Sequence, residues 1–337
     1  MSGTSTARTS DPSSRTVVVT GIGLALPGVA TYGDLLGPLP GEGGFDPATG
    51  LTGRELRHKD RASRLALRAV ESALDDAGLT DATAAFTGAA DATAVVVSTN
   101  LGNADSVCDA ADTIAAEGVR GLSPLGLPRT SSNVVAGWVA IRYGLRGPNL
   151  TVCNGATSGL DALAWARNLM LAGRAEAAVV VGVEPAGAVT EKLLGEQSTD
   201  TAVAVVLEPA DPAGDRGARP RATIAGHARA QDLAEALSYA GMTQTTTIGL
   251  WLGDEASAGA GHLLAATRRI DLEAQLGPLS GALGVLQCAA AAAHFETGAT
   301  GNVLATVGGP RHDATAALLL TPWPTTRPST QEPGEHP

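Results

Sequence analysis

The amino-acid sequence predicts an α/β protein whose central strands run mostly parallel. Short Val-rich runs alternate with Ala- and Leu-rich stretches at helical spacing along most of the 337 residues, and this alternation is typical of α/β folds. The pattern restarts after the middle of the chain, and each half ends in two consecutive strands without room for a helix between them. This repeated ending predicts a duplicated βαβαβαββ unit.

The first half is expected to hold five strands and four helices. The predicted strands are Thr16–Gly23, Thr93–Ser98, Asn149–Cys153, Ala177–Val183 and Thr201–Leu207. The predicted helices are Arg61–Ala77, Ala104–Ala116, Ser132–Tyr143 and Ser158–Leu171. Gly78 and Gly173 stand at the ends of two of these helices, where a glycine in the left-handed conformation commonly terminates a helix.

The second half begins after a stretch rich in proline and glycine. Glu208–Pro220 holds three prolines and two glycines, a composition that favours a boundary between the halves. Beyond it the predicted strands are Arg221–Ala228, Thr246–Leu252, Asn302–Val307 and Ala314–Leu320, and the predicted helices are Gly259–Arg268 and Leu283–Thr297. We therefore expect halves at 16–208 and 221–322, a linker at 209–220, and disordered polar tails at 1–15 and 323–337.

Composition narrows the possible partners. The chain has 23 Lys and Arg against 34 Asp and Glu, a net charge of -11, and it has no basic run, which argues against nucleic acid or an anionic membrane as a partner. No apolar run is long enough to span a bilayer, and the first residues lack the apolar core of a secretory signal. Together these features predict a cytoplasmic protein.

No cofactor or metal site is expected from the sequence. The three cysteines form no CxxC pair and the histidines share no metal-ligand spacing, so neither a disulfide framework nor a metal centre is predicted. Gly21 and Gly23 follow the first strand as in half of a dinucleotide-binding fingerprint, but the remainder of that motif is missing.

The stretch Ala136–Glu184 gives the clearest indication of a chemical function. It is predicted to form a helix, a Gly-Pro turn, a strand, a glycine-containing bend and a long helix. A bend of this kind holds backbone N–H groups at the start of a helix. Enzymes of acyl transfer place a Cys or Ser there, because the helix dipole lowers its pKa and the amides stabilise an oxyanion.

This stretch resembles the β-ketoacyl synthases of the thiolase fold. The resemblance implies a thiolase-like, pseudo-duplicated fold with α-β-α-β-α layers and mixed central sheets. Counted from Gly147-Pro148 and checked at Ser158-Gly159, the nucleophilic cysteine of that family falls on Ala156. Alanine offers no nucleophile.

The other reactive positions of the family are also replaced. The first histidine position, after the strand Ile248–Leu252, holds Asp254, and the second, in a glycine-rich loop, holds Pro278. The family's lysine, five residues upstream of that loop position, falls on Glu273. Proline has neither an imidazole nor a backbone N–H, so it cannot assist decarboxylation of a malonyl thioester. We therefore expect no catalytic residue, only four vestigial positions.

A retained scaffold without reactive groups is similar to the chain length factors of type II polyketide synthases. The run Ser158–Gly173, Asp254 and the loop Gly277-Pro278-Leu279 carry this resemblance, which covers about Thr16 to Pro322. It implies a non-catalytic subunit that pairs with a ketosynthase, meets the acyl carrier protein only through that partner and encloses the growing polyketide. Known members usually have Gln where Ala156 stands, so a role of that Gln in decarboxylation is not carried over.

The resemblance also implies roles for two segments. The residues expected at the dimer interface, through strand pairing across a two-fold axis, are Asn149, Leu150, Thr151, Val152 and Cys153. The residues expected at the floor of the acyl tunnel are Ala104, Val107 and Ala111, with Cys108 and Ile114 as neighbours. The first three recur at i, i+3 and i+7 on one helical face, and their small size predicts a deep apolar tunnel suited to a reduced or polyene chain. Simple close packing of helices is the alternative explanation of these small residues.

Two other functions remain open at this level. The chain could be an active acyltransferase that uses Cys153, three positions before the bend, which predicts an acyl adduct on that residue. It could instead be a catalytically dead, homodimeric acyl-binding protein, which predicts stable expression without a partner. Small buried cysteines are usually inert, and a misplaced nucleophile loses its alignment with the oxyanion amides.

Overall fold

The computed structural model describes residues 16–39, 43–254, 264, 267–310 and 312–323. Its strands are β1 (Val17–Ala25), β2 (Thr93–Ser98), β3 (Asn149–Val152), β4 (Ala177–Glu184), β5 (Thr201–Pro209), β6 (Ala222–Ala230), β7 (Ile248–Leu252), β8 (Arg269–Ile270), β9 (Asn302–Gly308) and β10 (Thr315–Pro322). Its α-helices are α1 (Pro47–Gly50), α2 (Arg61–Asp76), α3 (Ala104–Glu117), α4 (Val134–Tyr143), α5 (Ser158–Leu171), α6 (Ala188–Leu194), α7 (Ala210–Asp215), α8 (Leu233–Tyr239), α10 (Glu273–Leu276) and α11 (Leu283–Glu296). The predicted α/β alternation is confirmed.

The strands form one ten-stranded mixed sheet in the order β3-β2-β4-β5-β1-β6-β10-β9-β7-β8. In each half, three parallel strands lie at the outer end, followed inward by two strands that each run antiparallel to their neighbour. The second half therefore has the same order of strands as the first, read in the opposite direction across the sheet. The halves join through a short antiparallel pairing of β1 with β6, so the two predicted sheets are continuous.

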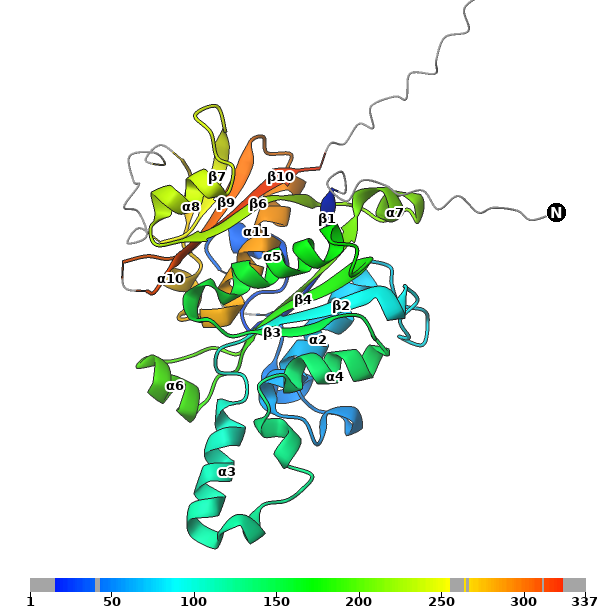
Figure 1. Ribbon diagram of the computed structural model, residues 1–337, viewed down its shortest axis with the longest axis vertical. Helices are drawn as coiled ribbons and strands as arrows, with labels where there is room; N and C mark the ends of the chain where they lie inside the picture. Colours follow the sequence, from blue (N-terminus) through cyan, green and yellow to red (C-terminus); the bar gives the residue numbers. More distant parts are fainter. Residues whose placement is uncertain (1–15, 40–42, 255–263, 265–266, 311, 324–337) are drawn as a thin grey trace, which may run out of the picture.

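Helices α5 and α11 pack against each other between the two halves of the sheet, as Figure 1 shows. Helices α2 and α4 cover the outer face of the first half, and α8 covers the second half. The two central helices approach closely because Gly159 and Gly284 face each other; a Cβ on Gly284 would lie 2.3 Å from the backbone nitrogen of Leu160. This arrangement gives the α-β-α-β-α layers that the resemblance implied.

The connection between the halves contains structure that the sequence did not predict, and other predicted regions lie largely outside the described residues. The stretch between the halves, predicted as a linker, contains α7, and Arg216 within it pairs with Glu208 and donates a hydrogen bond to the carbonyl oxygen of Ala77 (2.6 Å). The connection is therefore packed onto the first half. The predicted helix Gly259–Arg268 is described only at residues 264, 267 and 268, and the predicted tails, except Trp323, lie outside the described residues. No helix in the described ranges is long and apolar enough to cross a membrane.

Near the junction of the halves, a buried arginine bonds to three elements, α2, α11 and β1. Arg221 is 8% exposed and pairs with Asp76 of α2 (2.7 Å) and Glu296 of α11 (3.1 Å). It also donates to the carbonyl oxygen of Thr20 in β1 (2.7 Å). Because the guanidinium is held by two carboxylates and a carbonyl oxygen, its charge is compensated in the interior.

Replacing Arg221 by methionine is expected to lower the free energy of unfolding by about 3 kcal/mol or more, because it leaves Asp76 and Glu296 without their buried counter-charge. Urea unfolding followed by circular dichroism measures this loss. Arg219→Met is the matched control: its side chain is 74% exposed and also faces Glu296, at 3.5 Å, so a change below about 1 kcal/mol is expected. Equal losses in the two variants would contradict this role of Arg221.

Candidate functional site

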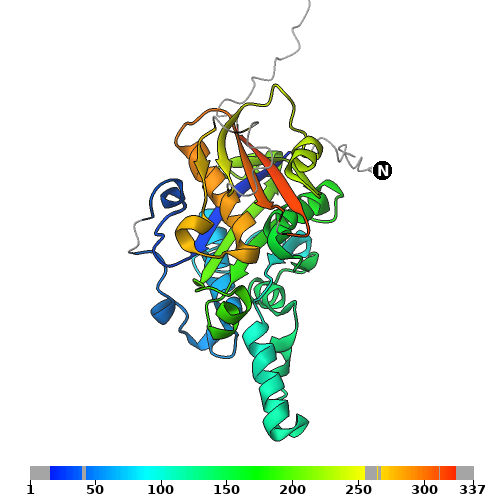
Figure 2. The same cartoon turned by 90° about the vertical axis from the view of Figure 1, so that its left-hand side faces the viewer.

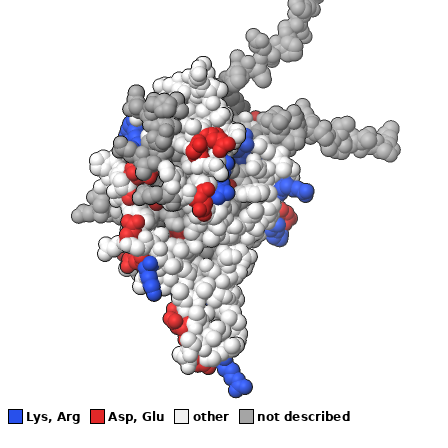
Figure 3. Space-filling model, turned by 60° about the vertical axis from the view of Figure 1, so that its left-hand side comes forward, with Lys and Arg blue, Asp and Glu red and all other residues white. Residues whose placement is uncertain are grey.

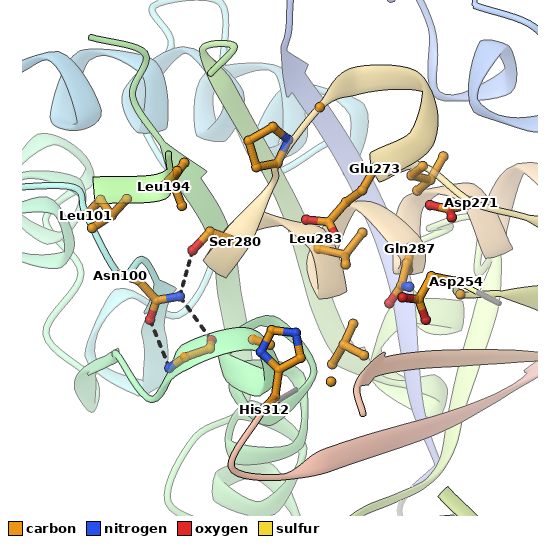
Figure 4. Close-up of a pocket in the computed structure, with 18 of the residues that line it drawn as sticks. Asn100, Leu101, Leu194, Asp254, Asp271, Glu273, Ser280, Leu283, Gln287 and His312 are labelled. Carbon is orange, nitrogen blue, oxygen red and sulfur yellow. Dashed lines mark hydrogen bonds between the residues drawn. The ribbon is translucent and has the colours of Figure 1, made fainter. Parts of the chain in front are cut away.

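A pocket of about 810 Å³ lies where the two halves meet. It is lined by residues that follow the carboxyl ends of strands in both halves: Asn100 after β2, Cys153 after β3, Asp254 after β7 and Asp271 after β8. Ligand sites of open α/β sheets commonly lie beyond such strand ends. Figure 4 shows side chains from distant parts of the sequence converging on this space.

All four predicted vestigial positions line this one pocket. Ala156 comes from the bend before α5, Asp254 from the end of β7, Glu273 from the start of α10, and Pro278 from the loop that follows α10. These residues were placed by sequence resemblance alone, and the fold brings them together although about a hundred residues or more separate the first from the others.

The bend before α5 is held from across the pocket by Asn100. Gly155 begins the bend with φ +82°, a conformation that suits glycine. The Asn100 side chain accepts from the Gly155 N–H (3.2 Å) and donates to the Gly155 carbonyl oxygen (3.0 Å) and to Ser280 Oγ (2.9 Å). These bonds, dashed in Figure 4, fix the segment that carries Ala156. The bend is therefore intact, although the side chain at its tip, that of Ala156, is only a methyl group.

Glu184, at the end of β4, holds the same region in place by accepting hydrogen bonds from backbone N–H groups. Its buried carboxylate accepts from the backbone N–H groups of Asn100 (2.6 Å), Leu101 (3.0 Å) and Gly281 (3.0 Å). Burial raises the pKa of the Glu184 carboxyl, while these amide donors act in the opposite direction. One side chain thus holds loops of both halves, which explains how this part of the pocket keeps its shape.

Cys153 lines the pocket and is exposed, so the expectation of a buried cysteine is wrong, but its surroundings suit nucleophilic attack poorly. Burial, and then the charge of Glu184, raise the pKa of the Cys153 thiol. The thiol points its hydrogen at the Asn100 carbonyl oxygen, 3.9 Å away. Since the thiolate is the reactive form, these surroundings disfavour catalysis by Cys153.

Alkylation should report this suppressed reactivity. In the folded protein, iodoacetamide is expected to modify Cys153 with a pH midpoint above that of the same residue after unfolding in urea, because the raised pKa reduces the thiolate fraction at each pH. Peptide mass spectrometry across a pH series measures both midpoints. A lower midpoint in the folded protein would reveal an activated thiol and revive the acyltransferase alternative.

The predicted tunnel residues do not line this pocket. Helix α3 projects from the body as an arm, clearly seen in Figure 2, and no residue of α3 is buried. Val107 and Ile114 are each 44% exposed, Cys108 and Ala111 are exposed, and Ala104 is half-buried. In Figure 3 most of the arm's visible surface carries no charge. In this chain alone, the face of α3 that carries Ala104, Val107 and Ala111 is therefore open and does not form the wall of a tunnel.

The predicted interface strand β3 is the end strand of the sheet. It pairs with β2 on one side, and no strand in the described part of the chain pairs with its other side. Asn149 is exposed and Val152 is buried, with Leu150 and Thr151 between these extremes. The strand is thus placed where an edge could pair with a second protein chain.

Comparison with known proteins identifies the family. Residues 29–198 match the N-terminal domain of the β-ketoacyl synthases, which covers half of the chain. The chain belongs to the β-ketoacyl synthase family. The match contains β2, the bend, α5 and β4, so the family predicted from the bend is confirmed.

Individual relatives match over part of their length. This chain is 33% identical over 144 residues to 3-oxoacyl-[acyl-carrier-protein] synthase 2 of Vibrio harveyi, covering 42% of this chain and 33% of that protein. It is 30% identical over 211 residues to a putative polyketide beta-ketoacyl synthase 2 of Streptomyces cyaneus, covering 55% and 50%. The matches thus span a third to a half of these curated β-ketoacyl synthases.

Solved structures match over nearly the whole fold. The ishigamide ketosynthase/chain length factor superposes with a TM-score of 0.74 at 25% identity, covering 92% of this chain and all of that one. A type II ketosynthase solved with its acyl-carrier protein gives a TM-score of 0.71 at 17% identity, covering 92% and 99%, which shows the fold alone. The thiolase-like fold predicted for this β-ketoacyl synthase family member is confirmed.

Two pocket residues were missed by the sequence analysis. Asn100 lies two residues after the buried strand β2, a place where functional side chains of α/β proteins often stand. Gln287 is the one amide within the apolar first turns of α11 and is 1% exposed. Its position inside an apolar run was a signal that it serves a specific contact.

Proposed function

We propose that this chain is a non-catalytic subunit, a chain length factor, which pairs with a ketosynthase and shapes the space for the growing polyketide. The observation that supports this most strongly is the pocket itself. It is built from the bend, the helix α5 and the loops that Glu184 holds. The four positions that are reactive in the family are occupied by Ala156, Asp254, Pro278 and Glu273.

Each replacement removes a different step of condensation. Ala156 cannot form a thioester, so no acyl group can be held at the bend. Asp254 and Pro278 cannot supply the neutral imidazole donors that stabilise the enolate formed on decarboxylation. Glu273 replaces a cation with an acid beside the place where a malonyl carboxylate would lie. The set as a whole is therefore unsuited to acyl transfer.

The surfaces left open by this chain support a partner. Within the described residues, β3 leaves one edge unpaired, and α3 exposes the apolar side chains of Val107 and Ile114. A ketosynthase of the same fold would present the matching edge and could close the space beside Ala104, Val107 and Ala111. The carrier protein would then deliver substrates to the partner, which supplies the catalytic cysteine.

The proposal predicts that this chain depends on its partner. Expressed alone, it is expected to be largely insoluble, and co-expression with a candidate ketosynthase should give a soluble heterodimer, because pairing covers the edge of β3. Affinity purification through a tag on the ketosynthase, followed by size-exclusion chromatography, measures this. A stable, soluble homodimer would instead support the acyl-binding alternative.

Intact mass spectrometry of the heterodimer tests the absence of catalysis. After incubation with malonyl and acyl carrier protein, an acyl adduct is expected on the ketosynthase and none on this chain. As a negative control, the ketosynthase with its nucleophile changed to serine should lose the rapid adduct. An adduct on this chain, mapped to Cys153, would overturn the proposal.

A further inference from the structure

The pocket has a strongly acidic lining. Glu196, Asp254, Asp271 and Glu273 all face it, and the described lining residues include no lysine or arginine. His312, on the turn between β9 and β10, is the one lining side chain that can become cationic among those described. The pocket therefore repels anions, including the carboxylate of a malonyl group.

Glu273 is held in place within this acidic lining. Its carboxylate accepts from the Leu279 N–H at 2.8 Å. Burial raises the pKa of the Glu273 carboxyl, and the neighbouring charges of Asp271 and Asp254 raise it further. Because an added cation would relieve this repulsion, the electrostatics favour a positively charged guest.

A buried amide provides an independent sign of a ligand. Gln287, 1% exposed, donates from Nε2 to the carbonyl oxygens of Leu252 (3.2 Å) and Thr306 (3.0 Å). These two acceptors fix the amide, since a flip would set Oε1 against two carbonyl oxygens. Oε1 accepts no hydrogen bond from the described part of the chain.

The Gln287 side chain lines the same pocket as Asp254, and Figure 4 shows both reaching into it. A buried acceptor without a donor is destabilising, because it has lost its hydrogen bonds to water. An acceptor beside carboxylates is satisfied by a group that carries both donors and positive charge. No group of three or more His, Cys, Asp or Glu among the described residues could hold a metal ion, so an organic cation suits the site better than a metal.

The remaining lining is apolar and roomy. Leu101, Leu194, Leu283 and Val307 contribute apolar surface, and about 810 Å³ is within the usual range of small-molecule sites. The guest should therefore combine a charged head with an apolar body.

We infer that the vestigial pocket binds an organic ammonium, a primary amine on an aliphatic body, through Asp254, Glu273 and Gln287 Oε1. This inference rests on the proposed function, because it requires the pocket to be free of acyl-enzyme chemistry. The ammonium donates to the amide oxygen and the carboxylates, while the aliphatic body packs against the leucine-rich wall. Carboxylic acids of the same length are excluded by charge.

A matched series of probes tests the inference on the full chain in its soluble form, with the ketosynthase partner where that is needed. Isothermal titration at pH 7 and low ionic strength compares n-hexylamine, 1-hexanol and hexanoate. Hexylamine is expected to bind at least ten-fold more tightly than 1-hexanol, about 1.4 kcal/mol, with no measurable binding of hexanoate. Equal binding of amine and alcohol, or no binding of the amine, would overturn the inference.

Variants assign the binding to this pocket. Glu273→Gln keeps an acceptor for the Leu279 N–H and is expected to weaken hexylamine binding about ten-fold while leaving 1-hexanol unchanged. Glu176→Gln, on an exposed residue outside the pocket, is the control and should change neither. If Glu273→Gln leaves hexylamine binding unchanged, the amine binds elsewhere and the inference is wrong.

Gln287→Met removes the unpaired acceptor and is also expected to weaken hexylamine binding, with Gln275→Met, exposed on α10, as its control. Should Gln287→Met fail to fold, because it loses the bonds to Leu252 and Thr306, the Glu273→Gln result decides. The two proposals fail separately: an acyl adduct on this chain refutes the proposed function, whereas absent amine binding without an adduct refutes only this inference.

Discussion

Phenylalanine in place of Ala111 is expected to shorten the polyketide made by the heterodimer by at least one two-carbon unit. Ala104, Val107 and Ala111 lie on one face of α3, and none of them is buried in this chain. A partner that covers the face would enclose the space beside these small side chains. A phenyl ring there fills volume that the elongating chain would otherwise occupy.

The test compares product lengths by mass spectrometry after co-expression with the ketosynthase and its carrier protein. Ala116→Phe is the matched control, because this exposed residue lies about 140° around the same helix from Ala111 at 3.6 residues per turn. Its products should keep their length. If Ala111→Phe gives a folded heterodimer with unchanged products, α3 does not form the tunnel floor, and close helix packing explains its small residues.

Alanine in place of Gly23 is expected to lower the free energy of unfolding by about 3 kcal/mol and to reduce the yield of soluble protein sharply. Gly23 in β1 lies directly under α2, and a Cβ there would be 2.1 Å from the Ala69 carbonyl oxygen and 2.4 Å from the Ala73 nitrogen. Both are backbone atoms, so neither can rotate away. The strand or the helix would have to move.

Chemical unfolding of the heterodimer measures this loss, and Gly137→Ala provides the contrast. Gly137 is inside α4, and a Cβ at this position would meet nothing within 4 Å. Alanine there is expected to leave stability unchanged or raise it by up to about 1 kcal/mol, because alanine favours helix over glycine. A Gly23→Ala protein as stable as Gly137→Ala would show that β1 and α2 are not packed at this distance.

The two glycines after the first strand show how sequence and structure differ in what they reveal. Their spacing matched half of a nucleotide-binding fingerprint, yet their role is steric. A Cβ on Gly21 would lie 2.2 Å from the Ala73 carbonyl oxygen, just as Gly23 contacts the preceding turn of α2. The sequence marked both positions as unusual, but it did not contain the distance to a helix that begins some forty residues later.

Local patterns determined most of the elements. The strand β2 and the helix α5 have the predicted bounds, and Gly78 ends α2 with φ +66° as expected. Runs of valine and helix-ending glycines act through neighbours in the chain, so they can be recognised without the fold. Short helices such as α6 and α8 were missed, because seven residues carry little periodicity.

The sequence by itself also determined the family, because the stretch of strand, bend and helix around Ala156 records it. It further predicted that the reactive positions of the family are replaced. Only the tertiary structure decided that Asn100 and Gln287 belong to the same pocket, that α3 is an exposed arm and that the connection between halves is packed. These facts depend on the order of ten strands and on contacts between residues far apart in the chain, which local sequence preferences do not specify.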